Sequence, residues 1–349
     1  MIRCESNPII TKADVAPSTP QMEVLGVFNC GVAKYHNQTI LLLRVAEKAI
    51  DVNGFVRVPI FDVQTNREVI LDFDTNDRSI DFSDVRFVKT KDQLFLTSKS
   101  HLRLARSTDG IHFLIDDKPF LSSQFFYEEY GIEDPRITFV DDWYYIDYSA
   151  TSRHGVFTCL ARTKDFVSVE KLGIIFLPDN KDVSIFPQKI NGKYYALNRP
   201  VSAYFQRPEM WISTSADLRS FSEHHLLCEP RPDKFDSTRI GAGCVPVLTS
   251  KGWLEIYHGC DKNDKYCMGA LLLDANDPTK IIARSDEPLL QPEMPYELNG
   301  FMPSVVFGCG LLQEGDELKL YYGACDESIC LVSFSIEEIL HSLTYINNI

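Results

Sequence analysis

The sequence lacks the motifs that mark several large enzyme classes. It contains no P-loop, no G-x-G-x-x-G between a strand and a helix, no G-x-S-x-G and no H-E-x-x-H. A nucleotide-dependent enzyme, a serine hydrolase and a zinc peptidase are therefore disfavoured. No cysteine pair has C-x-x-C spacing, and no Cys/His set has the spacing of a zinc finger. We expect neither a metal nor a cofactor.

Long apolar runs and an excess of basic charge are also missing. No run of about 18 apolar residues occurs, so no transmembrane helix is expected. The N-terminal sequence MIRCESNPII lacks the basic and apolar regions of a signal peptide. The formal net charge of −14 argues against broad binding to nucleic acid or to an anionic membrane. Any anionic ligand must therefore be bound by a local group of cations.

The ten cysteines are scattered, and many lie within apolar runs such as VVFGCGLL and SICLVSF. We interpret them as buried free thiols that pack as small hydrophobic side chains. Together with the missing signal peptide, this favours a cytoplasmic location. No Gly/Ser-rich or Pro-rich linker divides the chain, so residues 1–349 are expected to form one domain.

A repeat runs along the chain. A short apolar strand, a turn with Gly, Asn or Asp, and a second aromatic-rich strand recur at intervals of about 50 to 60 residues. The instances begin at Gly31, Asp84, Asp134, Ile185, Cys244 and Ser304. This period is typical of the four-stranded blades of a β-propeller. Six hairpins fit either five or six blades, since the first and last hairpins can share a blade.

Two further elements complete the expected fold. Three strands run into Ser/Thr-x-Asp turns at Asp109, Asp165 and Asp217. We assign these aspartates a structural role because Asp binds nearby backbone N–H groups in such turns. Near the C-terminus, SIEEILHSL predicts a short helix with Ser335 as its N-cap. The expected fold class is all-β, a propeller with a short C-terminal helix.

The strongest candidate for chemistry is the segment GIEDPR, which directly precedes a strand. In a propeller, the entries of the innermost strands converge on one site. Pro135 is expected to hold Asp134 in extended geometry, so that Glu133 and Asp134 point to opposite sides. Arg136 can orient a neighbouring carboxylate or lower its pKa. The alternative to a catalytic role for this segment is a structural turn that is held by a salt bridge.

Four cationic groups occur at matching positions of later repeats, which is unexpected in so acidic a chain. They are Lys181, Arg199, Arg239 and His258. Converging on one channel, they would form a site able to bind phosphate through charge-assisted hydrogen bonds. Taken one by one, each is more often a surface cation or a member of a structural ion pair.

Other polar and aromatic residues are candidates for sugar contacts. Asn29, Arg44, Glu47 and Asp326 could bind sugar hydroxyls. The three tryptophans could be sugar platforms, although most aromatic residues here are expected to lie in the core of the blades. These tryptophans are Trp143, Trp211 and Trp253.

Several segments resemble glycoside hydrolase family 130 and occur in the same order along the chain. They are GIEDPRIT, IFPQKINGKYYALNRP, RIGAG, YHG, ALLLDANDPTKIIARS, VVFGCG and YYGACD. The likeness extends from about Asn29 to Asp326. It implies a five-bladed propeller that catalyses inverting phosphorolysis of β-mannosides, giving α-mannose 1-phosphate. The FNCGVAKY and LLLRVAEK segments are similar to the β-1,2-mannoside phosphorylases of the family, which favours a β-1,2 linkage.

The resemblance also implies roles for single residues. Asp134 matches the family's proton donor, which is thought to act through a hydroxyl of the bound mannose. The residues that match the phosphate site are Lys181, Arg199, Arg239 and His258. Those that match positions near the mannose site are Asn29, Arg44, Arg136 and Asp326. The expected partners are a β-manno-oligosaccharide and inorganic phosphate as co-substrate, with possible assembly into a homo-oligomer.

Two alternatives remain open at this point. The same family includes β-mannosidases, and inverting hydrolysis needs a second carboxylate to activate water. The candidates for that base are Glu133, Asp182 and Glu255. A hydrolase would gain nothing from four cations beside the sugar, so the cations favour phosphorolysis. The second alternative is a glycan-binding propeller without activity, because fold alone does not assign function.

Overall fold

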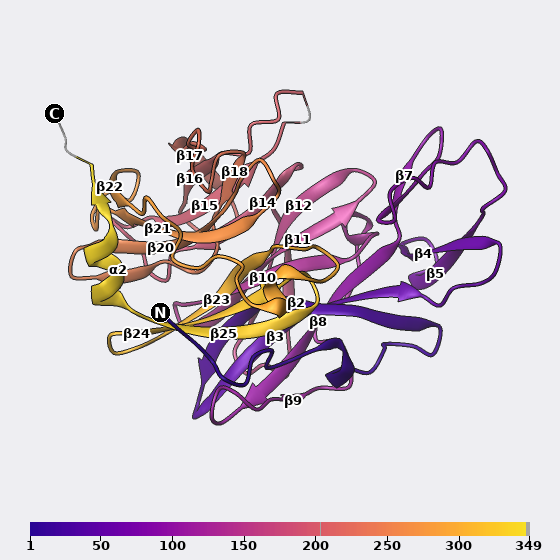
Figure 1. Cartoon of the computed structure of the whole chain (residues 1–349), viewed down its shortest axis with the longest axis horizontal. Coiled ribbons are helices and arrows are strands. Elements are labelled where there is room, and N and C mark those ends of the chain that lie inside the picture. The colour runs from indigo at the N-terminus through magenta and orange to yellow at the C-terminus, as the bar shows by residue number, and fades with distance from the viewer. Residues whose placement is uncertain (203, 347–349) are drawn as a thin grey trace.

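The computed structural model describes residues 1–202 and 204–346, and most of its strands form five sheets around a common axis (Figure 1). Three of these sheets, blades I to III, follow one another along the first two thirds of the chain. Blade I contains β2 (Met22–Tyr35), β3 (Gln38–Ala49), β8 (Ser98–Ser107) and β9 (Leu114–Ile115). Blade II contains β10 (Ile132–Val140), β11 (Trp143–Ser152), β12 (Gly155–Thr163) and β13 (Glu170–Phe176). Blade III contains β14 (Asn180–Ile185), β15 (Tyr194–Pro200), β16 (Met210–Ser215) and β17 (Phe221–Cys228).

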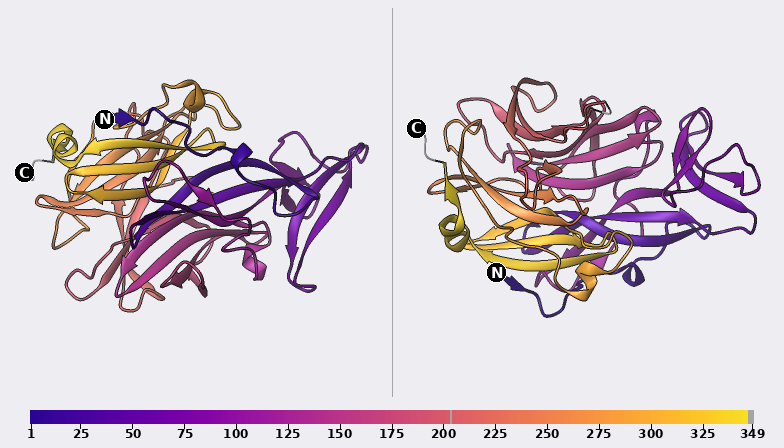
Figure 2. Two further views of the ribbon diagram at one scale, coloured as in Figure 1. Left: turned by 90° about the horizontal axis from the view of Figure 1, so that it is seen from below. Right: turned by 45° about the horizontal axis from the view of Figure 1, so that its top comes forward.

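The last two blades include strands from the two ends of the chain. Blade IV contains β18 (Arg239–Gly241), β19 (Val247–Thr249), β20 (Gly252–Cys260), β21 (Tyr266–Leu273), β22 (Ile281–Arg284) and β26 (Thr344–Tyr345). Blade V contains β23 (Val306–Glu314), β24 (Glu317–Ala324), β25 (Ser328–Ser335) and β1 (Ile2–Arg3). The N-terminal strand thus pairs with β25 and closes the ring, as the left view of Figure 2 shows.

Each pair of neighbouring blades encloses its own hydrophobic core, which explains the alternation of the strands. On β3, Ile40 and Leu42 pack toward blade II, whereas Leu41 and Leu43 pack toward blade V. Successive side chains of a strand point to opposite faces, so a blade between two neighbours is apolar on both. Further cores lie between blades II and III, III and IV, and IV and V. Five such interfaces form a closed ring of five blades.

The structure has five blades, whereas six hairpins were predicted from the sequence. The hairpins from Gly31 and Ser304 belong to different blades, so the sharing of one blade, which the sequence left open, does not occur. The hairpin that does not belong to a blade is the one from Asp84. It forms β6 (Phe87–Lys89) and β7 (Leu94–Leu96), which pack with β4 (Phe55–Asp62) and β5 (Arg67–Asp74) around a small separate core. In Figure 2 this insertion, residues 50–97, stands away from the blades.

Other local predictions agree with the structure. The turn aspartates each accept hydrogen bonds from two backbone N–H groups, for example Asp165 from Val167 and Ser168 at 2.9 Å each. The predicted helix is α2 (Ile336–Ser342), and the hydroxyl of Ser335 accepts the N–H of Glu338. The cysteines are all free, and all but Cys4 are buried.

The remaining described helical segments are short. They are α1 (Pro295–Leu298) and the 3-10 turns Lys12–Asp14 and Phe126–Glu128. Across residues 1–202 and 204–346, no helix has the length and apolar character needed to cross a membrane.

Candidate active site

The innermost strands of blades I to III carry a β-bulge at the same position. In each of them two residues lie opposite one residue of the second strand, and the first of the two has a left-handed backbone. These residues are Asn29 (φ 48°), Asp134 (φ 49°) and Asp182 (φ 53°). Bulges redirect side chains and are frequent beside active sites. Three successive blades thus present a buried polar side chain from an equivalent position.

This bulge overturns one local prediction. Asp134 is not extended, because its φ of 49° lies in the left-handed region. As a result Glu133 and Asp134 do not point apart. Nη2 of Arg44 lies 2.9 Å from Oε1 of Glu133, and Nη1 of Arg44 lies 2.8 Å from Oδ1 of Asp134. The preference of a pre-proline residue for extended geometry is outweighed here by the register of the surrounding sheet.

The second strands supply the cations. Arg44 on β3 lies opposite Phe28, Arg199 on β15 lies opposite Lys181, and His258 on β20 lies opposite Gly241. The bulge residues, the second-strand cations and three neighbouring charged residues form a buried to half-buried group that we call the channel cluster. It consists of Asn29, Arg44, Glu133, Asp134, Lys181, Asp182, Arg199, His258 and Asp326.

Asp134 is at the centre of the acidic half of the cluster. It is 7% exposed, and its Oδ1 accepts hydrogen bonds from Nδ2 of Asn29 at 3.0 Å and from Nη1 of Arg44. Burial raises the pKa of Asp134, but the positive charges of Arg44, Arg136 and Lys181 outweigh burial, so the net shift is downward. Asp134 is therefore ionised at neutral pH in the unliganded protein.

Asp326 is the second carboxyl group in this half. It lies in the turn between β24 and β25, with φ 56°, and the backbone of this turn accepts the N–H of Val27 at 3.1 Å. Burial raises the pKa of Asp326 to about 6, and the negative charges of Asp134 and Glu133 add to burial, whereas Arg44 and Lys181 oppose it. The acidic half thus pairs one carboxyl of lowered pKa with one of raised pKa, an arrangement typical of sites that transfer protons.

The cationic half surrounds Asp182. Oδ2 of this carboxylate lies 2.9 Å from Nη2 of Arg199 and 3.3 Å from Nε2 of His258. Among the described residues, Nε and Nη1 of Arg199, both ring nitrogens of His258 and Oδ2 of Asp182 are buried with no hydrogen-bond partner. Buried donors without partners are costly, and an anionic ligand would satisfy them.

Lys181 and Arg239 lie beside this half in different ways. Lys181 precedes Asp182 in the sequence, and its positive charge lowers the pKa values of Asp134 and Asp182. Arg239 lies farther out and is more exposed. It donates to the hydroxyl of Tyr266 at 2.8 Å and to Asp264 at 3.2 Å. The ring of Tyr266 stacks 6.2 Å from that of His258, so Arg239 borders the cluster through Tyr266.

Arg136 lies beneath the cluster rather than in it. It is 1% exposed, and its guanidinium donates to the carbonyl groups of Asp134, Ala242 and Gly243 at 2.9–3.1 Å. This arrangement ties β10 to the segment that follows β18. Its geometry fits a residue that holds Asp134 in place better than one that contacts a sugar.

The three carboxylates considered as a hydrolytic base differ in their surroundings. Glu255 is fully buried, accepts the N–H of Gly243, and has a pKa raised well above normal by burial. Burial raises the pKa of Asp182, but Arg199 and His258 outweigh it and leave the group strongly acidic. Glu133 is paired with Arg44. Asp182 and Glu255 are therefore poorly matched to the near-neutral pKa that suits a general base, and the guanidinium of Arg44 occupies an oxygen of Glu133.

Several sequence candidates lie outside the cluster. Trp253 is buried in the core between blades III and IV, and the ring of Trp143 is flanked by Arg162 and Lys164. Glu47 accepts the N–H of Ser18 at 2.6 Å and so holds the N-terminal segment on blade I. Conversely, reasoning from the sequence missed the ion pairs that Asp182 makes. The recurrence of a carboxylate at the same place in blades II and III was the available signal.

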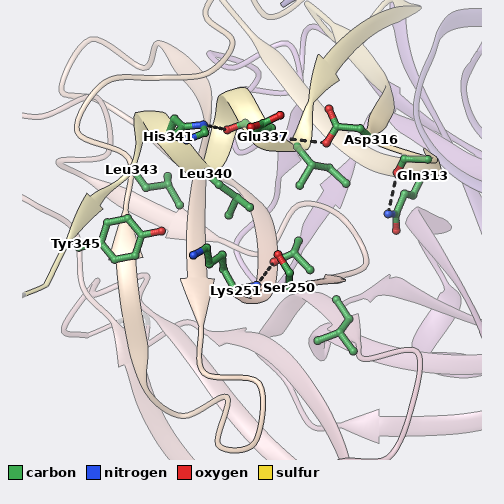
Figure 3. Close-up of a pocket in the computed structure, with 13 residues that line it drawn as sticks. Ser250, Lys251, Gln313, Asp316, Glu337, Leu340, His341, Leu343 and Tyr345 are labelled. Atoms are coloured by element: carbon green, nitrogen blue, oxygen red, sulfur yellow. Dashed lines mark hydrogen bonds between the residues drawn. The ribbon is translucent and has the colours of Figure 1, made fainter.

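A surface hollow of 790 Å³ lies elsewhere, under α2 at the outer edge of blades IV and V (Figure 3). Its labelled residues include Lys251, Asp316, Leu340 and Tyr345, and it contains no member of the channel cluster. Within residues 1–202 and 204–346, no group of three or more His, Cys, Asp or Glu side chains is arranged to hold a metal ion.

The fold and the channel cluster define a five-bladed β-propeller with a site of paired carboxyl groups and clustered cations on its axis. The model of glycoside hydrolase family 130, described as β-1,4-mannooligosaccharide phosphorylase, matches residues 86–345. The chain belongs to this family.

Relatives with known names are also similar. The chain is 47% identical to a β-1,2-mannobiose phosphorylase of Listeria innocua, over 98% of both chains. It is 40% identical to a 1,2-β-oligomannan phosphorylase of Thermoanaerobacter, over 69% of this chain and 80% of the relative. The solved structure of the Listeria innocua enzyme in complex with β-1,2-mannobiose superposes with a TM-score of 0.94 and covers 98% of each chain.

Proposed function

We propose that this protein is a β-mannoside phosphorylase that acts on β-1,2-linked manno-oligosaccharides. The observation that carries the proposal is the position of the buried, unpartnered nitrogens of Arg199 and His258, in the same cluster as Asp134. A site of this kind can hold an anion beside a sugar whose glycosidic oxygen receives a proton. The names of the two relatives described above support the substrate class and the linkage.

The proposed reaction inverts the anomeric centre. An oxygen of inorganic phosphate attacks C1 of the terminal mannose while the bond from C1 to the glycosidic oxygen breaks. Asp134 supplies the proton for the leaving oxygen through a hydroxyl of the bound mannose. The products are α-mannose 1-phosphate and a mannoside shortened by one residue. No metal or cofactor takes part, and phosphate is the only co-substrate.

Asp134 must be protonated before it can donate. In the unliganded protein its pKa is lowered by nearby cations. Phosphate bound by Lys181, Arg199 and His258 would neutralise part of this positive charge and raise the pKa of Asp134. Binding of the nucleophile would thereby prepare the acid. Asn29, Arg44 and Asp326 would bind the mannose hydroxyls, with Arg239 bordering the phosphate and Arg136 supporting Asp134.

The cations also explain why we propose phosphorolysis and not hydrolysis. Inverting hydrolysis needs a second carboxylate as base for the water, and the carboxylates of Glu133 and Asp182 are each held in an ion pair with an arginine. Phosphate is already an anionic nucleophile and needs only to be held in line. For the cellular setting we propose the cytoplasm, where phosphate is available, and association of the chain into a homo-oligomer.

The test is a paired incubation with β-1,2-mannobiose, with and without inorganic phosphate. We expect mannose 1-phosphate only in the presence of phosphate. Equal release of free mannose in both reactions would identify a mannosidase instead. Binding of mannobiose without turnover in either reaction would identify a glycan-binding propeller. β-1,4-mannobiose, used in parallel, tests the linkage.

A further inference from the structure

Asp182 contributes a negative charge where the proposed function requires an anion to bind. Its carboxylate is 2% exposed and lies beside two arginines and a histidine, at 2.9 Å from Arg199, 3.9 Å from Arg136 and 3.3 Å from His258. A carboxylate at this position repels phosphate. Asp182 therefore does not bind phosphate itself, and its position among these residues needs a different explanation.

We propose that Asp182 is a positioning residue that orients Arg199 and His258 for phosphate binding. Residue 241 is then a glycine because a side chain there would occupy the space in which Asp182 and His258 meet. This inference rests on the proposed function. The contacts of Arg199 support the positioning role of Asp182. Only Nη2 of that guanidinium is paired, with Asp182, while Nε and Nη1 are left without partners among the described residues. The carboxylate thus fixes the planar group at one nitrogen and leaves two others for phosphate oxygens.

His258 depends on Asp182 for a different reason. The charged and titratable groups that face the imidazole are Asp182 from β14, Arg199 from β15, Arg136 from β10 and Tyr266 from β21. The ring of Phe307, on β23, packs 4.4 Å away. Burial, together with Arg199 and Arg136, lowers the pKa of His258, and Asp182 opposes this shift. Asp182 therefore favours the charged imidazolium and sets which ring nitrogen faces the carboxylate.

Gly241 on β18 supplies an independent observation. A Cβ atom at this position would lie 2.5 Å from Oδ2 of Asp182, 2.6 Å from Cε1 of His258 and 2.9 Å from Nε2 of His258. Gly241 is not among the glycines with a left-handed backbone, so its main chain can be adopted by alanine. The space above its Cα is thus needed for the contact between these two side chains.

The experiment compares Asp182→Asn and Gly241→Ala with the wild type in phosphorolysis of β-1,2-mannobiose. We expect both variants to raise KM for phosphate at least tenfold and to change KM for mannobiose less than twofold. If the imidazolium binds phosphate, kcat/KM for phosphate falls as pH rises through the pKa of His258. Removing the Asp182 charge lowers that pKa, so in Asp182→Asn the fall moves to lower pH.

Asp236→Asn is the matched control for loss of stability. Asp236 is a fully buried carboxylate that pairs with Arg231 and Arg284 in blade IV. We expect its replacement to lower Tm and to leave KM for phosphate unchanged. If Asp182→Asn does not fold, Gly241→Ala carries the test, because it keeps every charge.

The outcomes separate this inference from the proposed function. A wild type that releases mannose without phosphate overturns both. A wild type that needs phosphate, with variants whose KM for phosphate is unchanged or lowered, overturns the positioning role of Asp182 alone. An equal rise of both KM values in the variants also overturns it, because a general loss of structure would have that effect.

Discussion

Nη1 of Arg44 lies 2.8 Å from Oδ1 of Asp134, and this ion pair joins the second strand of blade I to the first strand of blade II. The pair holds the proposed acid in its ionised form until ligands bind. It also crosses a blade interface, so the geometry of the acid depends on the closure of the ring. The first predictions concern the charges around this carboxylate.

Asp134→Asn should abolish turnover and preserve sugar binding. The amide is nearly isosteric but cannot act as an acid, and a positioned general acid contributes about 10²- to 10⁴-fold. We expect kcat to fall at least 10³-fold, a value within that range, while the Kd for mannobiose changes less than tenfold. Calorimetry and release of mannose 1-phosphate measure the two effects. Asp109→Asn, which alters a turn aspartate of blade I, should retain kcat.

Lys181→Met should weaken phosphate binding and shift the titration of the carboxyl groups. The Lys181 ammonium lowers the pKa values of Asp134 and Asp326. Its removal should therefore move the pKa of Asp326 above its present value of about 6. Carboxyl NMR titration follows the shift, and initial rates give the rise in KM for phosphate. Lys189→Met, at an exposed lysine paired with Asp141, should do neither.

Asp326 also predicts a particular dependence of stability on pH. Its pKa in the folded protein is about 6, against an ordinary value of 3.8. The unfolded chain therefore releases this proton first, so the group's contribution to stability is full below the ordinary pKa. It is lost as pH rises through about 6. Asp326→Asn removes this loss.

Relative to the wild type, Asp326→Asn should gain stability between about pH 4 and pH 7, on the order of 1–3 kcal/mol. Urea unfolding of both proteins at several pH values measures the difference, in which contributions from groups that do not interact with Asp326 cancel. A difference that does not change with pH would contradict the raised pKa.

Much of the fold was accessible from the sequence because blades are local units. Each hairpin and each turn aspartate, such as Asp165, is specified by residues close together in the chain. The Asp84 hairpin was misassigned for the same reason, since its local pattern matches that of a blade. Only long-range pairing, in which β3 joins β8 across the insertion, shows that it lies outside the blades.

Several members of the channel cluster could be chosen from the sequence, but their geometry could not. Asp134 and Arg199 could be chosen because their residue types recur at matching places in the repeats. The left-handed backbone of Asp134 could not, because the proline that follows it favours an extended conformation. The ion pairs of Asp182 likewise depend on strands from three blades, a relation that no local pattern contains.

Because β1 closes the ring, replacing an arginine on this strand should strongly lower the free energy of unfolding. Arg3 on β1 donates to the fully buried carboxylate of Glu297, through Nε at 2.9 Å and through Nη2 at 3.1 Å. Arg3→Ala leaves that carboxylate without its cation, and breaking a buried pair in this way costs about 3–5 kcal/mol. We expect a loss of this size in urea unfolding, because the pair with Glu297 anchors β1, whose backbone ladder with β25 has two residue pairs.

Lys280→Ala is the comparison for this prediction. Lys280 forms an exposed ion pair with Asp277 in blade IV at 3.1 Å, and exposed pairs contribute about 0–1 kcal/mol. Arg3→Ala removes a cation that pairs with the buried Glu297 and with the exposed Glu293, whereas Lys280→Ala removes a cation from one exposed pair. Because an exposed pair contributes little, the difference between the variants measures mainly burial and ring closure. Equal losses would mean that β1 adds little to blade V. A larger loss for Arg3→Ala, with the wild-type KM for phosphate retained, would show that the N-terminal strand stabilises the propeller without touching the channel cluster.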